Sequence, residues 1–156
     1  MYTIRVDSEP FDPNHEVDLL RGEDPAIGAV VSFIGLMRDL NEGDRVDNMF
    51  LEHYPGMTEN ALEQIVKLAF ERWQLQGCRV VHRVGELKPT DPIVLVTVAS
   101  AHRKEAFQAC EFIIDYLKTQ APFWKKEATE NGERWVDARD SDDEAIRQWS
   151  QAGNDH

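Results

Sequence analysis

The sequence predicts an α+β protein in which helices cover one β-sheet. An almost unbroken apolar run, Ile93–Ala99, predicts a strand buried in the middle of that sheet. It leads directly into residues 100–121, where apolar side chains recur at the spacing of one helix face: Ala106, Cys110, Ile113, Ile114 and Leu117. A length of 156 residues and a hydrophobic content of 42% suit one domain over residues 1–150, and we expect a disordered tail at 151–156.

The first half of the chain supplies three predicted strands and two predicted helices. Alternating or β-branched apolar residues predict the strands, and helical spacing predicts the helices, the second of which we expect Thr58 to cap. Residues 36–45 are polar and rich in turn formers, which predicts a mobile loop. The expected strands are Tyr2–Val6, Gly28–Gly35 and Asn48–His53, and the expected helices are Glu16–Arg21 and Thr58 to about Trp73.

The second half continues with a strand, a turn, the central strand and the long helix. Ser100 has the side chain of an N-cap for this helix, and Pro122 is expected to end it because proline lacks the amide donor. An Asn131-Gly132 turn then predicts a hairpin. The expected strands are Cys78–Val84, Ile93–Ala99, Phe123–Glu127 and Arg134–Val136.

Composition excludes several classes of function. A formal net charge of -12 argues against general nucleic-acid binding and against attraction to anionic membranes. No apolar run approaches the ~20 residues that a membrane-spanning helix needs. The first residues lack the charged-then-apolar layout of a secretion signal, so we expect a cytoplasmic protein.

Neither a metal site nor a bound cofactor is expected. The two cysteines, Cys78 and Cys110, form no metal-binding or disulfide pattern, and Cys110 lies on the apolar face of the long helix. The histidines are too scattered for a metal site, and His82 within a predicted strand is expected to be structural. No glycine-rich phosphate loop or serine nucleophile motif is present.

Cations gather at the two ends of the long helix, in a protein that is otherwise acidic: His102, Arg103, Lys104, Lys118, Lys125 and Lys126. Together with Phe123 and Trp124 they suit a flat anionic ligand, although solvated side chains that complement the helix dipole are the alternative. His102 and Lys118 are separated by roughly 24 Å along a straight helix. Either there are two sites, or a dimer brings the start of one helix to the end of its mate.

Four segments closely resemble the large, catalytic subunits of molybdopterin synthases: Leu51-Glu-His-Tyr-Pro-Gly-Met-Thr58, Ser100-Ala-His-Arg103, Tyr116-Leu-Lys118 and Ala121-Pro-Phe-Trp-Lys-Lys-Glu127. The similarity runs from about Gly28 to Trp149. It implies an α/β hammerhead-type fold with an additional small antiparallel β subdomain, and a homodimer at the centre of a heterotetramer. It also implies a small ubiquitin-like sulfur-carrier subunit, whose C-terminal Gly-Gly thiocarboxylate converts a cyclic pyranopterin monophosphate into molybdopterin.

The resemblance also implies roles for individual residues. Lys118 and Lys125 match catalytic lysines, with the division of labour between them left open. Leu36 stands where some relatives carry a lysine. The residues that match substrate-binding positions are Leu36, Met37, Arg38, His102, Arg103, Lys126, Glu127 and Arg139.

Two other classes of function remain open at the level of sequence. The same cations could serve a binding module without chemistry. Alternatively, Cys78 or Cys110 could carry sulfur in a thiol-dependent sulfurtransferase. Only the synthase interpretation requires a second protein that ends in Gly-Gly.

Overall fold

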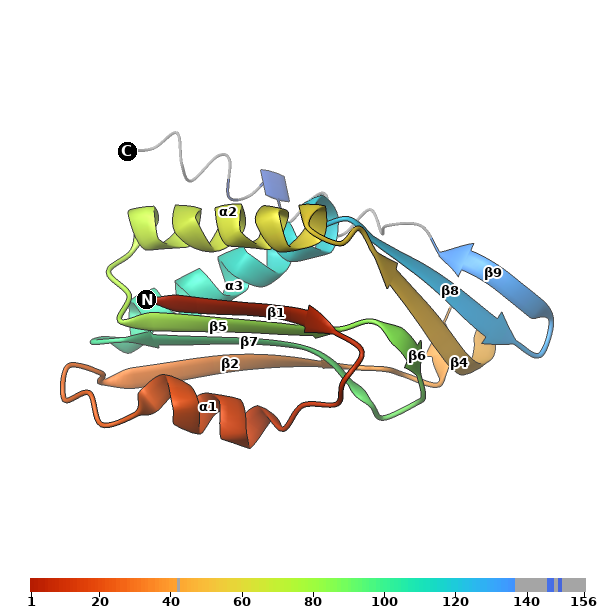
Figure 1. The fold of residues 1–156 in the computed structure, drawn as a ribbon, viewed down its shortest axis with the longest axis horizontal. Helices are drawn as coiled ribbons and strands as arrows, with labels where there is room; N and C mark the ends of the chain where they lie inside the picture. Colours follow the sequence, from red (N-terminus) through yellow and green to blue (C-terminus); the bar gives the residue numbers. More distant parts are fainter. Residues whose placement is uncertain (42, 137–145, 148, 150–156) are drawn as a thin grey trace.

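The computed structural model describes residues 1–41, 43–136, 146, 147 and 149. Within these residues the chain forms two sheets, two long helices and one shorter helix (Figure 1). The expected α+β fold with an additional antiparallel β subdomain is confirmed. Arg139 and the tail predicted at 151–156 lie outside the described residues.

The first sheet contains four strands in the order β1 (Tyr2–Asp7), β5 (Gly77–Arg83), β7 (Pro92–Ser100) and β2 (Ala29–Leu36). β1 runs parallel to β5, while β7 pairs antiparallel with both of its neighbours. β7 is buried along most of its length, as its apolar sequence predicts for a strand with neighbours on both sides.

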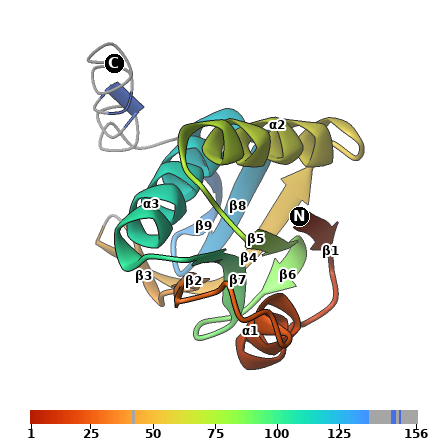
Figure 2. The same ribbon diagram turned by 90° about the vertical axis from the view of Figure 1, so that its left-hand side faces the viewer.

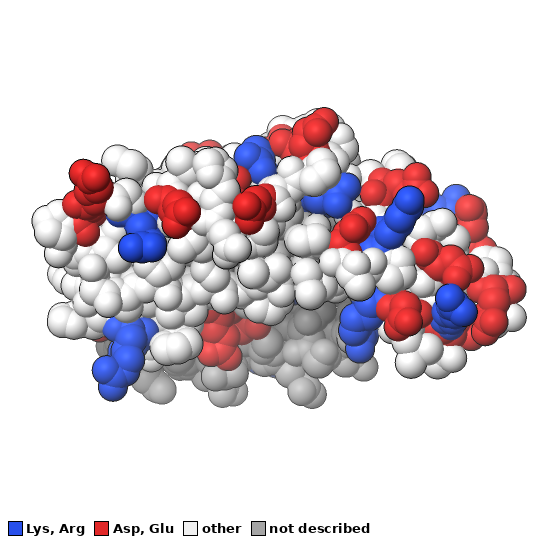
Figure 3. Space-filling model, turned by 90° about the horizontal axis from the view of Figure 1, so that it is seen from below, with Lys and Arg blue, Asp and Glu red and all other residues white. Residues whose placement is uncertain are grey.

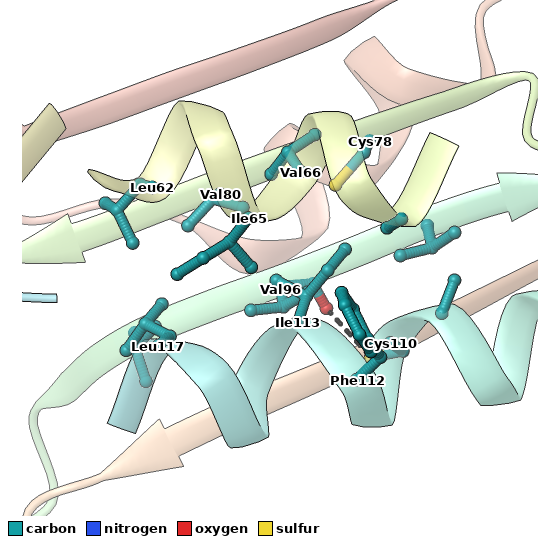
Figure 4. Packing of buried hydrophobic residues seen from close by; sticks show 14 of the residues in the cluster. Leu62, Ile65, Val66, Cys78, Val80, Val96, Cys110, Phe112, Ile113 and Leu117 are labelled. Atoms are coloured by element: carbon teal, nitrogen blue, oxygen red, sulfur yellow. Dashed lines mark hydrogen bonds between the residues drawn. The ribbon is translucent and has the colours of Figure 1, made fainter. Parts of the chain in front are cut away.

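Two helices pack on one face of this sheet and a shorter one packs on the other (Figures 1 and 2). α2 (Met57–Arg72) and α3 (Arg103–Gln120) lie on the first face, and α1 (Pro13–Arg21) lies on the second. Figure 4 shows side chains of α2, α3, β5 and β7 meeting in the main core. Its fully buried members include Leu62, Val66, Val80, Val96, Phe112 and Ile113.

The second sheet forms the β subdomain and joins segments far apart in the chain. Its strands follow the order β3 (Leu40–Asn41), β4 (Asp44–His53), β8 (Phe123–Thr129) and β9 (Gly132–Val136), and β6 (Gly85–Leu87) also pairs with β4. The hairpin of β8 and β9 was expected, but its turn lies at residues 130–131, one position before the predicted Asn131-Gly132, because Gly132 pairs with Thr129. The predicted loop at 36–45 was wrong in part, because this segment contains β3 and the start of β4. Pairing between these two strands holds its polar residues in an extended conformation.

Both predicted helix caps were wrong, because tertiary contacts use their hydroxyl groups instead. Ser100 is the last residue of β7, and its Oγ donates to the Gln74 carbonyl at 2.9 Å; His102 precedes α3 without a side-chain cap. Thr58 lies inside α2, where its Oγ1 donates to the Pro122 carbonyl at 2.9 Å. Gly56, with φ of +86°, precedes the helix because glycine adopts that conformation readily.

Two features are absent from the described part of the chain. None of its helices is long and apolar enough to cross a membrane. The same residues also contain no group of three or more His, Cys, Asp or Glu side chains that could hold a metal ion.

Candidate functional site

A small cavity lies where the end of β2 meets the second sheet. Its volume is about 80 Å³, and it brings together five of the residues singled out from the sequence: Leu36, Met37, Arg38, Lys125 and Glu127. Leu40, Asn41, Met49 and Ile93 complete its wall. Lys125 and Glu127 are two residues apart on β8 and therefore share one face of the strand. We call this space the lysine pocket.

The carboxylate of Glu127 is held in place at the base of the lysine pocket. Its exposed fraction is 4%, and Oε1 accepts hydrogen bonds from Asn41 Nδ2 at 2.9 Å and from Arg134 Nε at 3.4 Å. Arg134 also donates to Asp44 Oδ2 at 2.7 Å and to the Asn41 carbonyl at 2.9 Å. A buried carboxylate needs such partners to stay ionised. Glu127 therefore ties β8 to β3, β4 and β9.

Asn41 and Arg134 were not identified from the sequence. The hairpin register places Arg134 directly opposite Glu127, whereas a two-residue turn at the predicted Asn131-Gly132 would have placed Val136 there. No local signal identifies Asn41, because it meets Glu127 across 86 residues of chain.

The segment that follows β2 is held by the turn before β7. The Met37 amide donates to the Asp91 carbonyl at 3.0 Å, and the Thr90 amide donates to the Met37 carbonyl at 2.8 Å. Met37 is buried, whereas Arg38 is exposed at the edge of the lysine pocket. A rigid strand end thus presents the Arg38 guanidinium to solvent and to any anion that enters.

Lys118 is exposed in the last turn of α3 and is absent from the lining of the lysine pocket. Its charge acts on the buried imidazole of His82, on β5. Burial lowers the pKa of His82 to about 3, and the charges of Lys118 and His53 act in the same direction. His82 is therefore neutral at physiological pH.

His102 and Arg103 line a second, larger cavity at the opposite end of α3. Its volume is about 740 Å³, and its wall also includes Gly28, Ala29, Ala101, Lys104, Phe107 and Gln108. Gly28 makes close approach possible, since a Cβ atom there would lie 2.2 Å from the Ala101 carbonyl oxygen. Its amide donates to the Ser100 carbonyl at 3.0 Å. We call this space the helix-start pocket.

The structure therefore sorts the predicted residues into two separate groups. α3 has 18 residues, so its two ends are on the order of 27 Å apart; the helix-start pocket lies at its first turn and Lys118 in its last. Among the described residues, His102 and Arg103 line only the helix-start pocket. The group around Lys125 lines only the lysine pocket.

Lys126 lies apart from both pockets, on the other face of β8 from Lys125. Its Nζ pairs with Glu133 Oε2 at 3.0 Å and lies 5.7 Å from the centre of the Trp135 ring. Figure 3 shows cations and carboxylates interleaved over the end of the molecule that contains the second sheet. An exposed pair of this kind contributes little to stability.

Both thiols are buried in the main core. The exposed fractions are 1% for Cys78 and 4% for Cys110, and Cys110 Sγ donates to the Val96 carbonyl at 3.6 Å (Figure 4). Burial raises the pKa of both thiols, that of Cys110 to about 12. A thiolate is the reactive form, so neither cysteine is suited to act as a nucleophile.

Comparisons with known proteins agree on one family. The profile of the family described as MoaE protein matches residues 6–120. The chain is 60% identical over 149 residues to the molybdopterin synthase catalytic subunit of Ralstonia nicotianae, covering 96% of this chain and 85% of that protein.

Solved structures give the same result. The MoaE protein of Burkholderia ambifaria superimposes with a TM-score of 0.83 at 54% identity, covering 96% of this chain and 99% of that one. A chain of a Helicobacter pylori complex, described as subunits 1 and 2 of molybdopterin-converting factor, matches with a TM-score of 0.72 over 87% of this chain and 91% of that one. At 20% identity, this last likeness supports the fold alone.

Proposed function

The chain belongs to the MoaE protein family, and on that premise we propose that it is the catalytic subunit of a molybdopterin synthase. The proposed reaction transfers sulfur from the C-terminal thiocarboxylate of a small ubiquitin-like carrier to cyclic pyranopterin monophosphate. In each transfer the thiocarboxylate sulfur forms a carbon–sulfur bond on the pterin as an oxygen substituent leaves that carbon, and water then cleaves the acyl–sulfur bond and releases the carrier as its carboxylate. Two transfers complete the dithiolene of molybdopterin.

The observation that carries this proposal is the meeting of Arg38, Lys125 and the anchored Glu127 in one pocket. A narrow cavity with cations at its edge suits an extended Gly-Gly tail, because glycine has no side chain to exclude. Within it, we assign to Lys125 the role of neutralising the thiocarboxylate or polarising its carbonyl group. We assign the pterin contact at the pocket mouth to Leu36, Met37 and Arg38.

Lys118 is the second proposed catalytic lysine. It lies in the last turn of α3, and the chain passes from that helix end through Ala121 and Pro122 into β8. An ammonium group there can attract the phosphate of the substrate or transfer a proton to the reacting pterin. Lys126 and Arg139 remain proposed substrate contacts on the strength of the resemblance.

The helix-start pocket is the proposed binding place for the pterin phosphate. Its volume lies within the range of ~300–1,000 Å³ typical of small-molecule sites. His102 and Arg103 supply cations, and the free amides at the start of α3 add a favourable dipole for an anion. One ligand cannot reach from this pocket to the lysines of the same chain.

A homodimer resolves that separation. We propose that the helix-start pocket of one chain completes the lysine pocket of its partner, with two carriers bound to form a heterotetramer. The carrier is assigned by the family resemblance, and the Helicobacter complex provides a precedent in a protein of the same fold.

The thiol-dependent route is disfavoured by the burial of Cys78 and Cys110. A binding module without chemistry remains the competing function, because it would use the same cations. The two are distinguished by product formation.

The test is reconstitution from purified components. The protein is mixed with a thiocarboxylated carrier and cyclic pyranopterin monophosphate, and the dithiolene product is measured for the wild type, Lys118→Ala and Lys67→Ala. Lys67 is the matched control, since it is an exposed helix lysine that pairs with Glu63 at 3.5 Å, away from both pockets. Product from the wild type and Lys67→Ala, with at least a hundredfold less from Lys118→Ala, supports the synthase. A stable complex that never yields product would favour the binding module.

A further inference from the structure

A short bend connects the two proposed catalytic lysines, and three other elements hold it. The bend, residues 121–123, follows α3 and begins β8. From α2, the Thr58 hydroxyl donates to the Pro122 carbonyl at 2.9 Å. From β4, His53 pairs with Phe123 across the second sheet. From β5, the His82 ring stacks on Phe123 with their centres 3.9 Å apart and their planes 18° from parallel.

The orientation of the His82 ring is fixed from both sides. Nδ1 lies 2.8 Å from the Arg83 carbonyl oxygen, which can only accept, so Nδ1 carries the hydrogen and donates it. The flat faces of the ring are fixed by the stack on Phe123, and the exposed fraction of the residue is 4%. From the sequence alone, His82 was expected to be a structural residue only.

We propose that His82 is a positioning residue for Lys118 and Lys125. Its ring places Phe123, and Phe123 lies two residues before Lys125 on the same face of β8, so its position sets where the Lys125 side chain begins. The catalytic meaning of this role depends on the function proposed above, whereas the geometric statement does not.

The neutral state of the His82 ring also suits its role in positioning the two lysines. The titratable groups that act on it are Lys118 from α3 and His53 from β4, and both are cations when protonated. A positive charge on the imidazole would repel the Lys118 ammonium. A neutral aromatic ring therefore fits this position, and a charged side chain does not.

Two substitutions separate the stack from the hydrogen bond. His82→Phe keeps a neutral flat ring of similar size but loses the Nδ1 donor. His82→Gln keeps an amide donor but loses the ring. The control is His15→Gln, which makes the same replacement at an exposed histidine on α1.

The kinetic test uses the reconstituted synthase with its carrier. We expect His82→Gln to lower kcat at least tenfold, while KM for the pterin and carrier binding stay within about twofold. We expect His82→Phe to recover kcat to within about threefold of the wild type. Wild-type kcat in His82→Gln, or equal losses in both variants, would overturn the positioning role.

A second readout does not depend on catalysis. The six lysines are converted to their ¹³C-dimethyl forms, and the Lys118 and Lys125 signals are assigned by NMR with Lys118→Arg and Lys125→Arg variants. His82→Gln should move these two signals and leave those of Lys67 and Lys88 in place. Unmoved signals would overturn the inference, whereas absent wild-type product with moved signals would refute the proposed function alone.

Folding of the variants is checked by thermal unfolding before either readout. Should His82→Gln fail to fold, His82→Phe decides: a folded variant with wild-type lysine signals supports the stacking account. A folded His82→Phe whose Lys118 and Lys125 signals are displaced contradicts it.

Discussion

Glu127 on β8 lies opposite Arg134 on β9, and Arg134 Nε is 3.4 Å from Glu127 Oε1. The same guanidinium reaches Asp44 Oδ2 on β4 at 2.7 Å and the Asn41 carbonyl on β3 at 2.9 Å, so one arginine on β9 joins the two edge strands of the second sheet. This relationship fixes the face of β8 that carries Lys125. The stability of the second sheet and the position of Lys125 are therefore coupled at this point of the fold.

Removing Arg134 should destabilise the second sheet. Arg134→Ala leaves the nearly buried Glu127 carboxylate with fewer partners, and we expect a loss of about 2 kcal/mol in the free energy of unfolding. Urea denaturation measures it. Arg45→Ala, which removes a largely exposed pair at 3.7 Å, should change stability by less than about 0.5 kcal/mol. Equal losses in both variants would contradict the anchoring role.

Adding a methyl group at Gly28 should damage the helix-start pocket. In Gly28→Ala the new Cβ meets the Ala101 backbone oxygen at 2.2 Å, which forces Ala101 and His102 to move. We expect at least a tenfold rise in KM for the pterin, with carrier binding unchanged. Gly77→Ala is the control, because its Cβ meets the flexible end of Leu20 at 2.9 Å. An unaltered KM in Gly28→Ala would remove His102 from substrate binding.

Much of the first sheet and its helices follows from sequence alone. β7 and α3 were predicted well, because an unbroken apolar run and a helical repeat are strong local signals. The caps at Ser100 and Thr58 failed, because both hydroxyls bond to distant backbone carbonyls. β3 was missed because its pairing with β4 involves polar residues that resemble a loop.

The candidate site was only partly predictable. Consecutive residues of a strand face opposite sides, so the separation of Lys125 from Lys126 could have been read from the predicted hairpin. The stack of His82 on Phe123 could not, because 41 positions separate the two rings and neither lies in a distinctive motif.

The thiols should be unreactive in the folded protein. With pKa values raised by burial, to about 12 for Cys110, both remain protonated at pH 8. Ellman's reagent should therefore react at least a hundredfold more slowly with native protein than with protein unfolded in urea. The Cys78→Ala/Cys110→Ala variant should retain full kcat. Rapid labelling coupled to loss of activity would restore the thiol-dependent route.

Acid should destabilise the fold through His82. The pKa of its imidazole is about 3 in the folded protein and 6.5 in the unfolded chain, so below pH 6.5 the unfolded chain binds a proton that the folded chain does not. This destabilising contribution is absent above pH 6.5 and grows as pH falls toward 3. At pH 4.5 it amounts to roughly 2–3 kcal/mol.

Comparison with His82→Phe isolates that contribution. Urea denaturation at pH 7 and pH 4.5 should show a larger loss for the wild type than for His82→Phe, because carboxylates contribute equally to both proteins. Identical losses would mean that His82 is protonated in the fold.

The shared site between two chains is tested most directly by mixing two inactive variants. Lys118→Ala and Arg103→Ala chains, each carrying a different affinity tag, are co-expressed, and the mixed dimer is isolated and supplied with thiocarboxylated carrier and cyclic pyranopterin. In the proposed arrangement one of its two sites keeps both residues, so the mixed dimer should form dithiolene at about half the wild-type rate, while either variant alone forms almost none. A mixed dimer as inactive as its parents, beside an active wild type, would contradict the shared site.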